Sequence, residues 1–317
     1  MRQPITITET DAHKRLDKFL AGKSKSTRSQ IQKQIKSGSV LVDNQIKSPH
    51  YELKPGEIVS FVSMPKTQAP AEPLGKIKPF KIIAETNDYL VINKPAGLLV
   101  HETAKGEKKT LVNRLLKKFP GLAAVGEEHY RAGIIHRLDK NVSGVMVIPK
   151  TQKMYEHLKE QFRERKVTKI YTALVHGRLS EPEGTIDIPI GRSTVGFKMA
   201  AHPRNHGRRF QRTDKTAITK YETQKEFLHF TLLKITIKTG RTNQIRVHLT
   251  ALGNSIAGDT TYAIKKYHNQ AAKHPLDRLF LHATTLGFKD LNNEYKEFTA
   301  KLPTELKTFL HGLKKAN

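Results

Sequence analysis

The chain has 317 residues, and its 56 lysines and arginines against 29 aspartates and glutamates give a formal net charge of +27. Cysteine is absent, which excludes disulfides, thiol nucleophiles and cysteine-ligated zinc. A basic excess spread along the whole sequence attracts polyanions, so nucleic acid is the expected partner. A membrane surface is the competing polyanion, but no segment has the ~20 apolar residues that a span needs.

The dispersed histidines form no HExxH pair, so we expect no metal site. The sequence has no phosphate-binding P-loop and no dinucleotide glycine motif, so we expect no cofactor. The N-terminal segment lacks an apolar stretch followed by small residues, which argues against a secretory signal. A cytoplasmic location is therefore expected.

Residues 13–62 have the pattern of a small separate unit. Apolar side chains recur at helical spacing over 16–20 and again over 31–35. The runs at 40–42 and 58–62 are typical of strands. The order predicts two helices followed by a small sheet.

The sequence of this unit, STRSQIQKQIKSGSVLVDN followed by LKPGEIV, resembles the S4 RNA-binding module. On its second helix Arg28, Gln32 and Lys36 share one face. We expect Arg15, Arg28 and Lys36 to contact an RNA backbone. The alternative is a basic helix that is only solvated.

Residues 63–76 are rich in proline and alanine and predict a semi-rigid linker. Residues 77–317 then mix strand-like runs with helices expected at 151–165, at 242–252 and after Pro303. Long alternating segments such as 227–237 indicate a mixed, largely antiparallel sheet. The expected fold class is therefore α+β.

The segment 131–150, RAGIIHRLDKNVSGVMVIPK, combines a short charged break with apolar flanks. The runs at 134–135 and 145–148 predict two strands, with Arg137 and Asp139 between them. This arrangement would place Asp139 at a strand end, where it could face a cleft. An ordinary salt-bridged turn is the alternative.

The HRLD sequence resembles the signature of the RluA family of pseudouridine synthases, and other segments match that family in the same order. The matching segments are DYLVINKPAGLLVH at 88–101, KIYTALVHG at 169–177, TGRTNQIRVHL at 239–249, IAGDTTY at 256–262 and LHATTLGF at 281–288. The resemblance covers nearly the whole chain, including the S4-like unit. It implies an enzyme that converts uridine to pseudouridine in RNA without metal or cofactor.

In that reaction uracil leaves C1′, turns, and rejoins the sugar through C5. Asp139 suits the position beneath the sugar, either as a nucleophile or as a stabiliser of positive charge at C1′. The family pattern offers Arg246 as its cationic partner. On the expected helix Arg246 lies beside the apolar stripe of Ile245 and Leu249. A phosphate contact or plain surface charge is the alternative for Arg246.

Tyr171 suits a place beside the base, because its ring can stack on uracil and its hydroxyl can take part in proton transfer. A core tyrosine with a satisfied hydroxyl is the alternative. By resemblance Arg137 fills the gap left by a flipped-out nucleotide. Its alternative is a structural ion pair.

Further RNA contacts are expected from Lys94 and Arg241, which lie in two of the matching motifs. The segment 202–215, HPRNHGRRFQRTDK, is strongly basic and without hydrophobic periodicity. Arg208 and Arg209 are expected to hold RNA there. An exposed charged insertion without a role is the alternative.

The sequence departs from the family pattern at three positions: Val142 stands where Thr or Ser is common, Asn243 where His is usual and Ala263 where Gly is usual. None of the three removes a proposed catalytic group. They bear on positioning and on substrate choice.

The prediction is a monomeric enzyme that modifies large-subunit ribosomal RNA or ribosome precursor particles, as in the RluD-like branch. The same chemistry on transfer RNA is one alternative. A non-catalytic RNA-binding or assembly factor is another, although such a protein has no need to keep Asp139, Tyr171 and Arg246 together.

Overall fold

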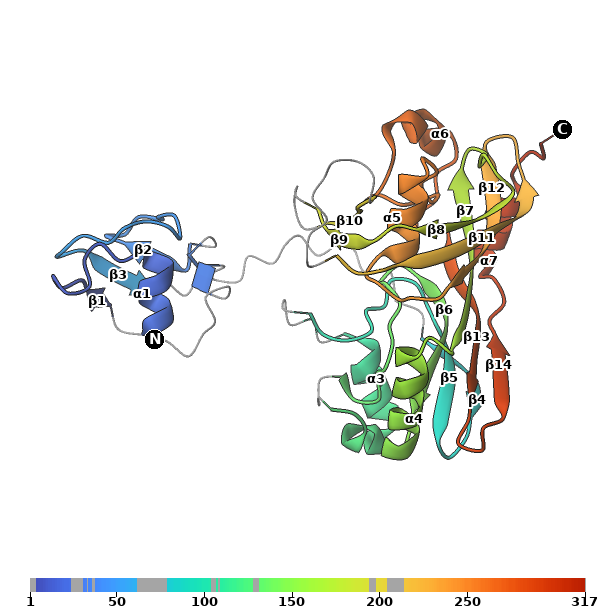
Figure 1. The fold of residues 1–317 in the computed structure, drawn as a ribbon, viewed down its shortest axis with the longest axis horizontal. Helices are drawn as coiled ribbons and strands as arrows, with labels where there is room; N and C mark the ends of the chain where they lie inside the picture. Colours follow the sequence, from blue (N-terminus) through green and yellow to red (C-terminus); the bar gives the residue numbers. More distant parts are fainter. Residues whose placement is uncertain are drawn as a thin grey trace. The chain divides into compact units, whose positions relative to one another are not determined.

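The computed structural model describes residues 4–23, 31–32, 34–35, 38–61, 79–103, 107, 109–127, 131–193, 198–203 and 214–316 (Figure 1). The chain divides into two compact units, Met1–Leu74 and Gly75–Asn317. The linker expected at 63–76 lies outside the described residues. Among the described residues no helix is long and apolar enough to cross a bilayer.

The N-terminal unit contains β1 (Ile5–Thr6), α1 (Leu16–Gly22), β2 (Val40–Val42) and β3 (Ile58–Phe61). The three strands form an antiparallel sheet in the order β1-β3-β2. The apolar residues that pointed to two helices are buried against this sheet, including Phe19, Ile31 and Ile35. The unit therefore has a hydrophobic core of its own.

The C-terminal unit is built on one large sheet of nine strands within the described residues. Its strands are β4 (Lys81–Glu85), β5 (Tyr89–Lys94), β6 (Ser143–Pro149), β7 (Thr168–His176), β8 (Glu183–Asp187), β11 (Ile218–Glu226), β12 (Phe230–Ile237), β13 (Leu281–Lys289) and β14 (Tyr295–Thr299). The order is β4-β5-β6-β13-β7-β12-β11-β8, and β14 also pairs with β13. Only β6 and β13 are parallel, at two residue pairs, so the predicted mixed and largely antiparallel sheet is confirmed.

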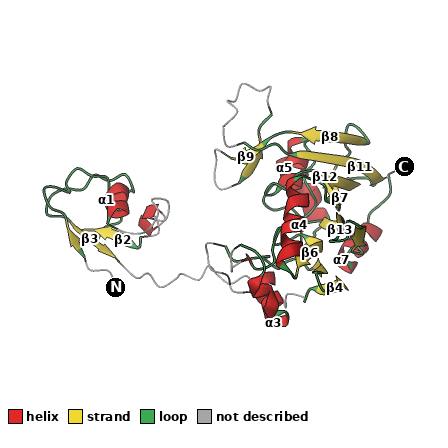
Figure 2. Cartoon of the chain, turned by 60° about the horizontal axis from the view of Figure 1, so that its bottom comes forward, coloured by secondary structure: helices red, strands yellow, loops and turns green. Residues whose placement is uncertain are grey.

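Around the sheet lie the helices α3 (Leu111–Lys118), α4 (Gln152–Arg163), α5 (Gln244–Ala251), α6 (His268–Lys273) and α7 (Thr304–His311), two 3-10 turns (Pro120–Ala124 and Lys265–Tyr267), and the short strand pair β9 (Ile190–Arg192) and β10 (Met199–Ala201). The three predicted helices are present as α4, α5 and α7. α4 begins after Thr151, whose Oγ1 accepts the Met154 N–H at 3.2 Å. α5 packs next to β11 (Figure 2). Residues at its N-terminal end line the pocket described below.

The segment before β6 differs from the prediction, because Ile134 and Ile135 form no strand. Gly133 has a φ of 67°, and a Cβ there would lie 3.2 Å from the Ile148 side chain, so the chain bends closely over β6. His136 then uses its Nε2 to accept the Val147 N–H at 3.1 Å. A side chain thus satisfies this backbone group, and Asp139 lies in an irregular loop four residues before Ser143 rather than at a strand end.

Candidate active site

Asp139 lies in a loop that is hydrogen-bonded to the NKPAG turn at residues 93–97. The Lys140 carbonyl accepts the Gly97 N–H at 2.8 Å and the Lys94 Nζ at 3.2 Å. Within the loop, the Val142 N–H donates to the Asp139 carbonyl at 3.1 Å. Two segments far apart in the sequence therefore fix the backbone that carries this carboxylate.

Lys94 is completely buried, so its expected contact with RNA is replaced by a structural role. Its Nζ also donates to the carbonyls of Pro95 at 2.9 Å and Leu98 at 2.8 Å. Burial, followed by the positive charge of Arg278, lowers the pKa of Lys94 to about 7, while Asp139 opposes this effect. The side chain offers no surface to a nucleic acid, because its three donors are used inside the protein.

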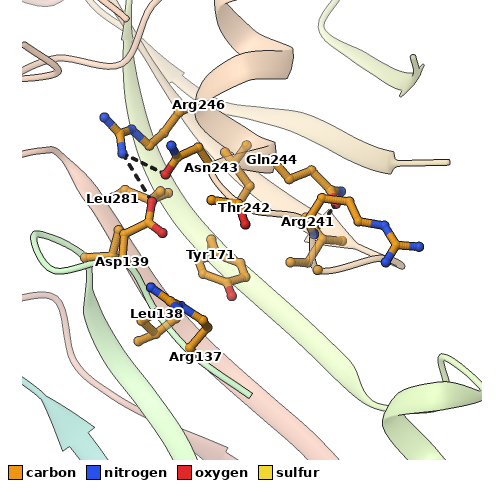
Figure 3. Close-up of a pocket in the computed structure, with 14 residues that line it drawn as sticks. Arg137, Leu138, Asp139, Tyr171, Arg241, Thr242, Asn243, Gln244, Arg246 and Leu281 are labelled. Carbon is orange, nitrogen blue, oxygen red and sulfur yellow. Dashed lines mark hydrogen bonds and ion pairs between the residues drawn. The ribbon is translucent and has the colours of Figure 1, made fainter. Parts of the chain in front are cut away.

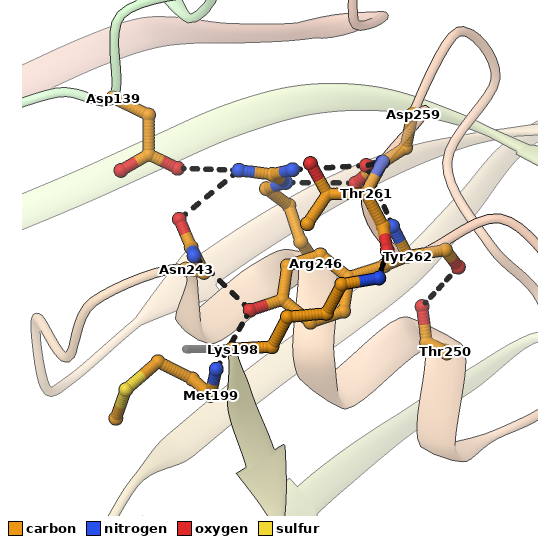
Figure 4. A network of polar contacts seen from close by, with 9 residues as sticks. All are labelled: Asp139, Lys198, Met199, Asn243, Arg246, Thr250, Asp259, Thr261 and Tyr262. Carbon is orange, nitrogen blue, oxygen red and sulfur yellow. Dashed lines mark hydrogen bonds and ion pairs between the residues drawn. The ribbon is translucent and has the colours of Figure 1, made fainter. Parts of the chain in front are cut away.

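Arg246 connects two carboxylates and an amide (Figure 4). Its Nε and Nη2 donate to the two oxygens of Asp259 at 2.7 and 2.9 Å, a bidentate arrangement. Its Nη1 donates to Asp139 Oδ2 at 3.3 Å and to Asn243 Oδ1 at 3.0 Å. Burial lowers the pKa of Arg246, but the hydrogen bonds and charges of Asp259 and Asp139 outweigh it, so the pKa is raised overall.

Asp259 completes this set of contacts, and the sequence did not single it out. Its side chain is 1% exposed. Besides Arg246, its Oδ1 accepts the backbone N–H groups of Thr261 and Tyr262 at 2.9 and 3.0 Å. The one available signal was its place as the only acidic residue in the matching IAGDTTY segment.

Asn243 immediately precedes α5 in a left-handed conformation, with φ 56° and ψ 21°. Asparagine tolerates this region better than most residues. Its Nδ2 donates to the Tyr262 hydroxyl at 3.1 Å, and that oxygen also accepts the Met199 N–H at 3.1 Å. The Arg246 guanidinium lies 4.9 Å from the centre of the Tyr262 ring. The departure from the family histidine thus still provides an acceptor for Arg246.

Tyr171 comes from β7 and points into the same pocket (Figure 3). Its pKa is raised, first by burial and then by the negative charge of Asp139. The hydroxyl therefore stays protonated at neutral pH and can donate a hydrogen bond. Tyr171, Asp139 and Arg246, predicted from separate motifs, line one pocket.

The walls of this pocket combine apolar side chains with charged and polar ones. Apolar side chains come from four separate parts of the catalytic unit: Leu138, Val142, Ile237, Ile245 and Leu281. Such a surface suits a flat, partly apolar ring that is oriented by hydrogen-bonding groups around it.

Two predicted RNA contacts lie at the rim of the pocket. Arg137 is exposed, and its Nη1 donates to His101 Nε2 at 3.0 Å. Burial first, and then the charges of Arg137 and Arg131, lower the pKa of His101 to about 4, so it accepts this bond as a neutral ring. The Nε of Arg241 donates to the Thr216 carbonyl at 3.1 Å, and its guanidinium points away from the carboxylate of the pocket (Figure 3).

The predicted contacts of the N-terminal unit are only partly visible. Arg15 pairs with the fully buried Asp17 at 3.0 Å and also contacts His50, while its side chain stays 32% exposed. Gln32 donates to the same carboxylate at 2.6 Å. The remaining predicted RNA contacts lie outside the described residues: Arg28, Lys36, Arg208 and Arg209.

A carboxylate held by an arginine and placed beside a tyrosine is the arrangement expected for an RNA-modifying enzyme of the pseudouridine synthase class. The family model described as RNA pseudouridylate synthase matches residues 88–251, and the S4 domain matches residues 14–59. The chain belongs to the RNA pseudouridylate synthase family. It is therefore an enzyme that isomerises uridine in RNA.

Similar proteins extend over the full length. The chain is 35% identical over 316 residues to the uncharacterized RNA pseudouridine synthase YlyB of Bacillus subtilis, covering 98% of both chains. It is 36% identical over 324 residues to ribosomal large subunit pseudouridine synthase D of Xanthomonas campestris pv. campestris, covering 99% of this chain and 93% of that one. The solved structure of human RNA pseudouridylate synthase domain containing 1 is 25% identical with a TM-score of 0.60, covering 76% of this chain and 91% of that chain.

Within the described residues no group of three or more His, Asp or Glu side chains is placed to hold a metal ion.

Proposed function

We propose that this enzyme isomerises specific uridines of large-subunit ribosomal RNA. Full-length similarity to a synthase D and, at 31% identity over 324 residues, to ribosomal large subunit pseudouridine synthase C of Vibrio parahaemolyticus supports this substrate. The S4 unit and the net charge of +27 suit a large folded RNA. The observation that carries the proposal is the chain of contacts from Asp139 through Arg246 to Asp259, beside Tyr171.

Asp139 is the reactive carboxylate in this proposal. It is 24% exposed and faces the pocket, whereas Asp259 is enclosed behind Arg246. Asp139 either adds to C1′ or stabilises positive charge there while the bond from C1′ to N1 breaks. Both routes use a negative charge at this position, and the Arg246 guanidinium lies 3.3 Å from it.

The released uracil turns within the pocket and bonds to C1′ through C5. C5 then loses its proton and N1 ends with one, so the product has the same atoms as the substrate and no redox change occurs. Tyr171 provides a ring on which the turning base can stack, and its protonated hydroxyl can donate a hydrogen bond.

The target nucleotide must leave its helix to reach Asp139. Extrusion costs on the order of a few kcal/mol for an unstacked and unpaired base. Arg137 is exposed at the rim, two residues before Asp139, and occupies the gap in the RNA in this proposal. His101 orients its guanidinium from the protein side.

The proposal is tested by mapping pseudouridines in total RNA from cells with and without the gene. The mapping is then repeated with purified protein and transcripts. Uridines in large-subunit ribosomal RNA should lose modification in the deleted cells and regain it in vitro. Sites confined to transfer RNA would establish that alternative substrate. No change in any RNA, with intact binding, would identify a non-catalytic assembly factor.

A further inference from the structure

A cluster of four cations lies beside the pocket on the Tyr171 side. Lys169 precedes Tyr171 by two residues on β7, so both side chains are on one face of the strand. Arg165 follows α4, and Lys238 and Arg241 follow β12. All three positive charges contribute to lowering the pKa of Lys169, so they lie close enough to repel its ammonium group. Arg241 also lines the pocket that holds Tyr171.

The cluster has no carboxylate partner among the described residues. Arg241 uses its Nε on a backbone carbonyl. Within the described part of the chain, no hydrogen bond or ion pair engages the side chains of the other three. The two glutamates at this end of α4 are already paired, Glu160 with Arg163 and Glu164 with Lys166. The positive charge is therefore not balanced by any carboxylate of the residues that the structure describes.

Lys169 is the most confined member, because only 8% of the residue is exposed. Burial first, and then the three neighbouring cations, lower its pKa to about 8. The groups that face it from other elements are the Phe162 ring, 5.7 Å from its Nζ, and His136. Burial, and then Lys169 itself, lower the pKa of His136 to about 3, so that ring is neutral. An enclosed ammonium without an anion is costly unless a ligand supplies one.

The backbone at Arg165 adds an independent observation. Arg165 has a φ of 61° directly after α4, where glycine commonly ends a helix. Its N–H donates to the Phe162 carbonyl at 3.3 Å, and the Lys166 N–H donates to the Gln161 carbonyl at 2.9 Å, which closes the helix end. Glycine would make this turn without strain, so the arginine contributes a charge at a conformational cost.

We propose that Lys169, Arg165, Lys238 and Arg241 bind one backbone phosphate of the RNA next to the nucleotide in the pocket. The inference rests on the proposed function, and it assigns one phosphate of the RNA substrate to this cluster of cations. A phosphodiester supplies the missing negative charge, and its oxygens accept from both ammonium and guanidinium donors. Because Lys169 and Tyr171 share a strand face, the bound phosphate would fix the register of the nucleotide relative to Asp139.

The test compares RNA binding by Lys169→Met, Lys169→Arg and the wild type, using a transcribed large-subunit ribosomal RNA fragment as the probe. Lys169→Met keeps the apolar stem and should weaken Kd by about tenfold or more, as expected for a charge-assisted contact. The slope of log Kd against log salt should fall by about 0.7–0.9. The melting temperature should be unchanged or higher, because an enclosed charge is removed. Lys153→Met, at the exposed other end of α4, is the control and should bind like wild type.

A pH series gives the second readout. Wild-type affinity should fall between pH 7 and 9 as Lys169 loses its proton, and Lys169→Arg should bind without this fall. Arg165→Gly relieves the backbone strain and removes one charge, so it should keep the melting temperature while losing affinity. If Lys169→Met and Arg165→Gly both bind like wild type, the phosphate site is overturned. Binding by a wild type that isomerises no RNA would instead overturn the proposed function, and the same comparison would still decide the phosphate site.

Discussion

The Nη1 of Arg246 lies 3.3 Å from Oδ2 of Asp139, a long distance for a charge-assisted hydrogen bond. The same guanidinium holds Asp259 with two shorter bonds, of 2.7 and 2.9 Å. Asp259 is almost fully enclosed, whereas Asp139 faces the pocket. One arginine is thus fixed by a structural carboxylate and presents its remaining edge to the carboxylate that we propose to react.

Asp139→Asn should abolish uridine isomerisation, lowering the rate by on the order of 10³-fold or more, because the amide provides neither a nucleophile nor a negative charge. The shape of the side chain is kept, so RNA affinity and melting temperature should stay close to wild type. Chemical mapping of pseudouridine in treated transcripts measures the loss. Asp277→Asn, an exposed aspartate, is the matched control. Substantial turnover by Asp139→Asn would remove Asp139 from the mechanism.

Asp259→Asn should lower both stability and activity, which distinguishes it from Asp139→Asn. Breaking a buried pair costs about 3–5 kcal/mol, and because the Arg246 side chain is 13% exposed we expect the lower part of that range. The loosened guanidinium should reduce turnover by about 10–100-fold, as misplacement by about 1 Å can. Urea unfolding and single-turnover kinetics measure the two effects. A variant with wild-type rate would show that Arg246 needs no support from this carboxylate.

The alternating and amphipathic segments of the sequence predicted much of the fold. The alternation over 227–237 forms β12, and the expected helix at 151–165 forms α4. The strand predicted at Ile134–Ile135 was wrong, because a short apolar run need not pair with a neighbouring strand. Gly133 instead turns the chain over β6, and the His136 ring accepts the backbone N–H group. When a histidine ring, instead of a neighbouring strand, accepts a backbone N–H group, the sequence shows no periodic pattern that predicts it.

For the site, separate motifs predicted Asp139, Tyr171 and Arg246, and all three line the pocket. Two features depended on tertiary contacts that no motif reveals. Lys94 reaches a carbonyl 46 positions away along the chain, and this contact buries it. Asp259 reaches Arg246 on α5 because the chain bends at Gly258, directly before it. A Cβ at Gly258 would lie 2.1 Å from the Arg278 carbonyl oxygen, so the bend requires glycine.

The titration of Lys94 should make stability depend on pH with a defined sign. Its pKa is lowered to about 7 in the folded protein, by burial first and then by Arg278, against about 10.4 when unfolded. Between these values the unfolded chain binds more protons, so the free energy of unfolding rises with pH. Below pH 7 both states are protonated and the contribution is constant.

Lys94→Met removes this titration and leaves carbonyls without a donor, so it should destabilise the protein by about 1–3 kcal/mol at pH 7. The difference in unfolding free energy between wild type and variant should then grow by about 2–3 kcal/mol from pH 7 to pH 9.5. Urea unfolding across this range measures it, with the exposed Lys81→Met as the control. A difference that stays flat would mean that Lys94 is charged throughout.

Removal of residues 1–74 should leave a folded catalytic unit that binds RNA more weakly. The two compact units have separate hydrophobic cores, and the core of the C-terminal unit is formed by its own residues. Each RNA phosphate that the protein no longer binds without its S4 unit should reduce the salt slope of binding by about 0.7–0.9. Circular dichroism, thermal unfolding and binding at two salt concentrations measure these effects.

The full-length double variant Arg28→Gln, Lys36→Gln separates RNA binding from folding, because it removes two charges of the S4 unit while keeping the unit in place. It should reproduce part of the weakened affinity and part of the reduced slope, equivalent to up to about two phosphates. Turnover at saturating RNA should change little in either protein, since the pocket residues all come from the C-terminal unit. A truncated enzyme that equals the full chain in affinity and salt dependence would show that the S4 unit does not hold this RNA.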